Sequence, residues 1–217
     1  MRVLPILFNT DMVRAILDGR KTVTRRLPSK RIENKWDDYC DYVSAVATTG
    51  CTSFTEKQFY EQYPPYQPGD ILYVRETWCK NYYHDYGKYF YRADGEEIDM
   101  PLITGGTIKY GKADGLRWRP SIHMPKEAAR IWLKVTDVRV ERLQDITDEQ
   151  AKAEGANWKN GKNVGFEEKM RRTAVERFAE IWDSAIKKSD LGLYGWDANP
   201  WVWVIAFERC EKPEEEK

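Results

Sequence analysis

The 217-residue sequence contains few cysteines and histidines and no long apolar run. Its four cysteines form no Cys-x-x-Cys pair and only two histidines are present, so the close ligand pairs typical of structural zinc sites are missing. No stretch approaches the ~20 apolar residues of a membrane helix, and no small-residue cleavage site follows the apolar N-terminus. We therefore expect a cytoplasmic protein with no metal, no cofactor and no membrane partner.

The sequence also lacks the glycine-rich loops that hold nucleotide phosphates. No Gly-x-Gly-x-x-Gly motif is present. The segment Gly19-Arg20-Lys21-Thr22 differs from a Walker loop, because Arg20 separates its glycine from its lysine and the earlier glycine is missing. Binding of ATP or GTP through such a loop is therefore not expected.

Charge is balanced over the whole chain but not locally. The 35 basic and 35 acidic residues give a net charge of zero, which excludes a protein that coats polyanions uniformly. The window from Arg14 to Lys35 nevertheless holds eight basic residues against two acidic ones, a local charge of +6. Clustered arginine and lysine attract phosphates. The window predicts an anionic ligand, or else a solvated basic loop whose charges pair with acids elsewhere.

Hydrophobic periodicity predicts short strands mixed with a few helices. Expected strands are Val3–Phe8, Lys21–Arg26, Ile71–Val74, Tyr89–Arg92, Ala129–Val140 and Trp201–Phe207. Expected helices are Thr10–Gly19 with Thr10 as cap, Thr55–Tyr63, Asp145–Gly155 with Thr147 as cap, and Glu167–Ile186. Because helices and strands do not alternate, a doubly wound sheet is excluded. The pattern predicts an α+β fold or a small barrel with helices.

Several side chains could carry chemistry. Lys21 and Thr24 are three residues apart, which places them on opposite faces of a strand but in one cleft if the segment bends. A desolvated lysine beside a hydroxyl is a known arrangement for activating a nucleophile. Glu76 could pair with the basic window. Tryptophans near strand ends, among them Trp78, suit base stacking beside cations, although most of the nine are expected in the core.

Four blocks in order resemble the ASCH domain, including ASCH proteins of phages and prophages. They are Gly19–Arg26, Pro68–Val74, Val135-Thr136 with Leu143–Thr147, and Trp203–Phe207. The resemblance implies a PUA-like small β-barrel with flanking helices and long inserted loops. It implies one domain over residues 1–210, with insertions near 28–67, 79–128 and 156–198, and an acidic tail at 211–217.

The resemblance also implies a cleft that recognises RNA or a modified nucleoside. Residues expected to bind the nucleic acid are Arg20, Arg25, Arg26, Glu76 and Trp78. The Lys-Thr-x-Thr stretch is similar to that of the N4-acetylcytidine amidohydrolases, a small ASCH family. That similarity implies Thr24 as nucleophile, Lys21 as its activator and Glu154 as proton shuttle. Recognition, amide hydrolysis and ribonuclease action stay open as alternatives, with the last disfavoured because both histidines lie outside the matching blocks.

Overall fold

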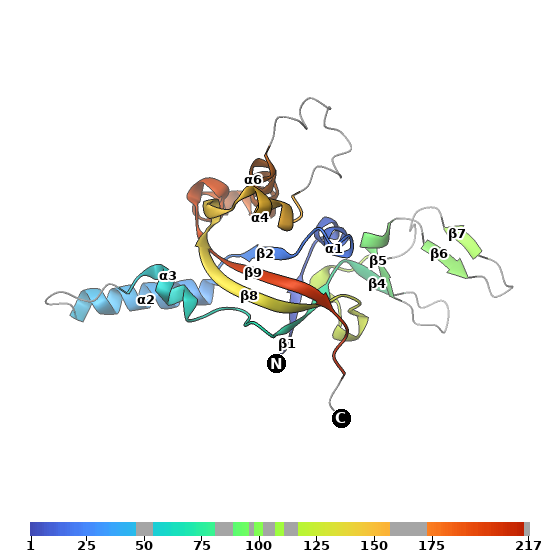
Figure 1. Cartoon of the computed structure of the whole chain (residues 1–217), viewed down its shortest axis with the longest axis horizontal. Helices are drawn as coiled ribbons and strands as arrows, with labels where there is room; N and C mark the ends of the chain where they lie inside the picture. The colour runs from blue at the N-terminus through green and yellow to red at the C-terminus, as the bar shows by residue number, and fades with distance from the viewer. Residues whose placement is uncertain are drawn as a thin grey trace. The chain divides into compact units, whose positions relative to one another are not determined.

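The computed structural model describes residues 1–46, 54–80, 89–95, 98–101, 107–110, 117–156 and 173–214. These residues form a five-stranded sheet, two two-stranded sheets and several helices, so the predicted α+β class is confirmed (Figure 1). The strand order of the larger sheet is β1-β3-β8-β9-β2. Its strands are β1 (Val3–Leu7), β2 (Val23–Arg26), β3 (Ile71–Arg75), β8 (Trp132–Arg142) and β9 (Trp201–Cys210). Strand β1 is parallel to β3, whereas the β3–β8 and β2–β9 pairs are antiparallel.

The chain divides into two compact units. The first comprises Met1–Gly19, Asp70–Lys134 and Arg209–Lys217, and the second comprises Arg20–Gly69 and Val135–Glu208. The expected organisation as one domain with insertions stays a prediction. Each unit is described by itself below.

In the first unit, helix α1 (Thr10–Leu17) follows β1. Its cap is Asn9, whose side chain accepts a hydrogen bond from the Met12 backbone N–H, so the predicted cap Thr10 is wrong by one residue. The helix ends before Gly19, whose φ of +71° suits glycine. The remaining elements are β4 (Trp78–Lys80), β5 (Tyr89–Tyr91), β6 (Ile98–Pro101), β7 (Thr107–Tyr110) and the 3-10 turns η1 (Arg92–Asp94), η2 (Ser121–His123) and η3 (Lys126–Ala128).

The second unit holds the remaining helices. They are α2 (Lys30–Val46), α3 (Glu56–Glu61), α4 (Asp148–Ala153), α6 (Ala174–Ala185) and α7 (Leu191–Tyr194), with 3-10 turns η4 (Leu143–Asp145), η6 (Lys188–Asp190) and η7 (Trp196–Ala198). Thr147 caps α4 as predicted, through a capping box with Gln150. Helix α6 begins after Thr173, and the earlier part of the expected helix at 167–172 lies outside the described residues. Helices α4 and α6 pack together over a core that includes Val202 and Val204 of β9, with Val23 of β2 packed against it.

Helix α2 corrects the expectation for residues 28–67. That region was expected to hold one short helix, at Thr55–Tyr63, but α2 adds 17 helical residues before it. Its apolar positions Ile32, Trp36 and Tyr39 follow the spacing of one helix face. Trp36 and Tyr39 pack against Phe59 of α3, with ring centroids 5.2 and 6.1 Å apart. The stripe is aromatic rather than aliphatic, and many charges surround it, which explains why it was missed.

Candidate functional site

Lys21 and Glu154 form a buried ion pair in the second unit. Lys21 lies just before β2 and is 2% exposed. Its ammonium Nζ donates to Glu154 Oε2 at 2.6 Å, to the Glu154 carbonyl at 3.0 Å and to the Val23 carbonyl at 2.8 Å. An ammonium has three protons to donate, so these bonds fit its full capacity. The pair joins residues 133 positions apart in the sequence.

The local backbone explains why Glu154 reaches Lys21. Glu154 is the C-terminal cap of α4, where helix carbonyls lose their intrahelical partners. The chain then turns at Gly155, whose φ is +89°, and the Ala156 N–H donates back to the Ala151 carbonyl at 3.1 Å. This turn leaves both the Glu154 carbonyl and its carboxylate directed at Lys21. The Thr22 N–H also donates to the Ala153 carbonyl at 2.9 Å, which fixes the end of α4 against the start of β2.

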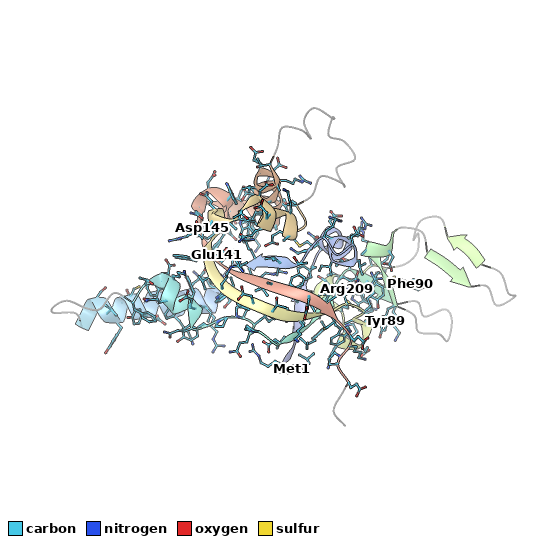
Figure 2. All side chains as sticks on the ribbon, in the orientation of Figure 1. Met1, Tyr89, Phe90, Glu141, Asp145 and Arg209 are labelled. Carbon is cyan, nitrogen blue, oxygen red and sulfur yellow. The ribbon has the colours of Figure 1, made fainter. Side chains whose placement is uncertain are left out.

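Arg25 orients the same carboxylate from inside the protein. Its side chain has no exposed area, and its guanidinium lies 3.3 Å from Glu154 Oε1 and 3.3 Å from Glu141 Oε2. It also donates to Gln150 Oε1 at 2.7 Å. Glu141 lies near the end of β8, just before the turn η4 that leads to α4 (Figure 2). Sequence reasoning placed Arg25 on a ligand surface, but in the structure its contacts are with Glu154, Glu141 and Gln150.

The surroundings of Lys21 shift its pKa downward. Burial lowers the pKa of Lys21, because the charged ammonium has left water. The charge and hydrogen bond of Glu154 oppose this effect, while the nearby charges of Arg26 and Arg25 add to it, and the net pKa of Lys21 is lowered. A buried lysine of this kind can serve as a proton acceptor as well as a donor.

Thr24 and Arg26 project from the other face of β2. Side chains alternate along a strand, and Val23 packs in the core beside α6 while Arg25 lies near Phe178 of that helix. Thr24 and Arg26 therefore point away from this face. Thr24 is 3% exposed, and among the described residues its hydroxyl makes no hydrogen bond to Lys21 or Glu154. The structure thus brings Lys21 and Glu154 together, and adds no contact from Thr24 to the pair.

Arg26 is half-buried. Burial lowers the pKa of its guanidinium, and the neighbouring Tyr66 and Glu154 oppose that effect. The Glu154 carboxylate therefore acts electrostatically on Arg26 as well as on Lys21. Arg20, just before Lys21, is also half-buried in the second unit.

The two remaining predicted residues, Glu76 and Trp78, belong to the first unit. Both Glu76 oxygens accept from Arg130, at 2.9 and 3.1 Å, and burial raises the pKa of Glu76 while Arg130 opposes the rise. Trp78 is 4% exposed and packs in a core cluster with Met124 and Ala128. Its indole N–H has no hydrogen-bond partner among the described residues. Sequence reasoning missed Arg130, because no local signal links positions 54 residues apart.

Neither a metal-binding cluster nor a membrane-spanning helix is found among the described residues. No group of three or more histidine, cysteine, aspartate or glutamate side chains there is arranged to hold a metal ion. No helix in the described ranges is long and apolar enough to cross a membrane.

No protein-family model and no curated protein sequence matches the chain. Among solved structures, the chain is similar to an ASCH domain from Lactobacillus crispatus JV V101, at 11% sequence identity. The alignment covers 96% of this chain and 79% of that chain, with a TM-score of 0.34.

Proposed function

We propose that this chain is an ASCH-domain protein of PUA-like fold that recognises a modified nucleoside, free or within RNA, at the site around Lys21 and Glu154. The observation that carries the proposal is the buried Lys21–Glu154 pair, 2.6 Å apart, held by Arg25. Removing two opposite charges from water costs several kcal/mol per ion, which close pairing and further hydrogen bonds must offset. Buried ionisable groups with shifted pKa values are common at functional sites.

The chemistry of the pair suits a substituted cytosine. A glutamate carboxylate accepts hydrogen bonds from an exocyclic base amine, whereas a lysine donates to a carbonyl oxygen. An N4-acylated cytosine offers both partners side by side, the amide N–H and the acyl oxygen. Lys21 and Glu154 are 2% and 8% exposed, so a ligand that reaches them must displace the contact between them. Arg26, half-buried at the end of β2, provides a cation for the nucleoside's oxygens or phosphate.

Calorimetric titration of N4-acetylcytidine and cytidine tests the recognition. We expect the acetylated nucleoside to bind at least about tenfold more tightly, which corresponds to about 1.4 kcal/mol. Lys21→Met should abolish this preference, because it removes the donor to the acyl oxygen but keeps the Arg25–Glu154 contact. Lys188→Met is the matched control, since Lys188 is exposed in the same unit. Equal affinity of the wild-type protein for both nucleosides would contradict the proposal.

A second candidate function, hydrolysis of the same amide, is favoured by the lowered pKa of Lys21. In this reaction Thr24, whose hydroxyl makes no hydrogen bond to Lys21 in the described structure, must first turn toward the pair. Its oxygen then bonds to the acyl carbon, and its proton passes to the neutral Lys21 amine. The C–N bond then breaks, and the leaving nucleoside amine takes the proton from Lys21. Water hydrolyses the resulting ester on Thr24 and releases the acid.

Chromatography of N4-acetylcytidine incubated with the protein tests this second function. We expect the wild type and Thr24→Ser to release cytidine, and Thr24→Ala and Lys21→Met to release none. Turnover by Thr24→Ala at the wild-type rate would remove Thr24 as nucleophile, and no turnover by the wild type would leave recognition alone.

A further inference from the structure

A groove in the second unit runs beside β2, α2 and the segment after α3. Its volume is about 620 Å³, within the usual range for ligand sites. The lining residues come from four segments, which are the end of β2, the first turns of α2, the stretch 62–67 with its Tyr-Pro-Pro-Tyr sequence, and Trp203 of β9. Those that carry charge or aromatic rings are Arg26, Arg31, Lys35, Tyr63, Tyr66 and Trp203.

The groove is charged with one sign. Three cations line it, and no aspartate or glutamate is present among the described residues that line it. Arg31 and Lys35 are four residues apart on α2, so they lie on one helix face about 6 Å apart along the axis. Glu33 of the same helix lines a different cavity and accepts a hydrogen bond from the Tyr194 hydroxyl at 2.8 Å. Arg31 and Lys35 of α2 therefore line the groove, whereas Lys30 of the same helix pairs with Glu33 at 3.3 Å.

The groove also offers aromatic surface beside these cations. Tyr63 is 36% exposed, and the Lys35 ammonium lies 4.6 Å from the centroid of its ring. Tyr66 is half-buried, and Trp203 forms a buried part of the wall opposite Arg26 in the β2–β9 register. Tyrosine faces next to arginine and lysine are the usual means of stacking unpaired bases while binding their phosphates.

Arg26 connects this groove with the Lys21 site. It lines the groove and lies two residues after Thr24 on β2, within the electrostatic influence of Glu154. We propose that the groove binds a single-stranded nucleic acid, with Arg26, Arg31 and Lys35 on its phosphates and Tyr63 and Tyr66 against its bases. This inference rests on the proposed function, because it assigns the nucleoside at Lys21 to a longer strand. Most of the lining residues, at 29–35 and 62–67, fall within the expected insertion near 28–67.

The test is fluorescence anisotropy with a labelled single-stranded RNA of about twelve unmodified nucleotides at several salt concentrations. Three phosphate contacts predict a slope of about −2 in log affinity against log salt, at about −0.7 for each contact on a single strand. Arg31→Ala with Lys35→Ala should weaken binding by at least about tenfold at low salt and reduce the slope to about −0.7. Lys187→Ala with Lys188→Ala, which removes two exposed charges of the same unit, should change neither quantity.

Competition experiments show which groups of a nucleic acid the groove binds. Single-stranded DNA of the same sequence should compete with the RNA; equal competition supports a site that reads phosphates and bases, and weaker competition supports one that also reads the 2′-hydroxyl. Duplex RNA should compete poorly, since its bases are already stacked. Competition by polyglutamate as effective as that by RNA, or an unchanged affinity in the Arg31→Ala and Lys35→Ala variant, would overturn the inference.

Titration of that double variant with free N4-acetylcytidine separates this inference from the proposed function. Retained nucleoside binding with lost RNA binding supports both. RNA binding by the groove with no nucleoside binding by the wild type contradicts only the proposed function. Nucleoside binding by a wild type that does not bind RNA contradicts only the groove.

Discussion

Removal of the Glu154 charge tests whether the buried ion pair holds the second unit together. In the variant Glu154→Gln, two side chains with no exposed area, Lys21 and Arg25, lose their shared carboxylate. Breaking a buried ion pair by removing one partner costs about 3–5 kcal/mol, because the remaining charge stays buried. The glutamine oxygen can still accept from Lys21 and Glu141 still faces Arg25, so we expect the lower end, about 3 kcal/mol. That is roughly a hundredfold change in the unfolding equilibrium.

Urea denaturation followed by tryptophan fluorescence and circular dichroism measures this loss. Glu149→Gln is the control, because Glu149 is exposed on the same helix and the charge change is identical; its cost should stay below about 1 kcal/mol. The double variant Lys21→Met with Glu154→Leu should lose less unfolding free energy than the sum of the losses in Lys21→Met and Glu154→Leu, because neither member of the ion pair is left buried without the other. A loss below about 1 kcal/mol for Glu154→Gln, the size of an exposed pair, would refute the reasoning.

Three further predictions concern the same unit. The pKa of Lys21 is lower in the folded than in the unfolded chain, so between the two pKa values the unfolded chain binds more protons. The free energy of unfolding of the wild type, relative to that of Lys21→Met, should therefore rise as pH increases towards 10.5. A difference in unfolding free energy that does not change with pH, in denaturation curves of the two proteins, would contradict this. Thr147→Ala removes the capping hydroxyl that accepts from the Gln150 N–H, and should lower the free energy of unfolding by about 1 kcal/mol, whereas Thr147→Ser should keep most of it. Gly155→Ala forces a side chain onto a backbone with φ of +89°, so thermal unfolding should show a loss of about 1–2 kcal/mol, and an unchanged melting temperature would exclude the strained turn.

The sequence predicted local features better than it predicted the environment of the site. The Thr147 cap and the glycine turns at Gly19 and Gly155 were predictable, because capping and positive φ depend on neighbouring residues. Helix α2 was missed, because its packing stripe depends on aromatic contacts with Phe59, which lies twenty or more residues later. Non-local contacts of this kind leave no local pattern to read.

The candidate site shows the same division. The family resemblance selected Lys21 and Glu154, and the structure brings the two together, whereas the roles assigned to them stay predictions. The burial of Arg25 could not be predicted, because it depends on Glu141, Gln150 and Phe178 from three other elements. The pairing of Glu76 with Arg130, rather than with the basic window, likewise depends on contacts distant in the sequence.

The most direct test of the central claim compares one RNA oligonucleotide with and without a single N4-acetylcytidine, titrated into the wild type and into Lys21→Met. If the Lys21–Glu154 site recognises the modified nucleoside, the wild type should bind the acetylated strand at least about tenfold more tightly. Lys21→Met should bind both strands with the affinity that the wild type has for the unmodified one. Equal affinity of the wild type for the two strands would contradict the claim, whatever the affinity of the groove for RNA.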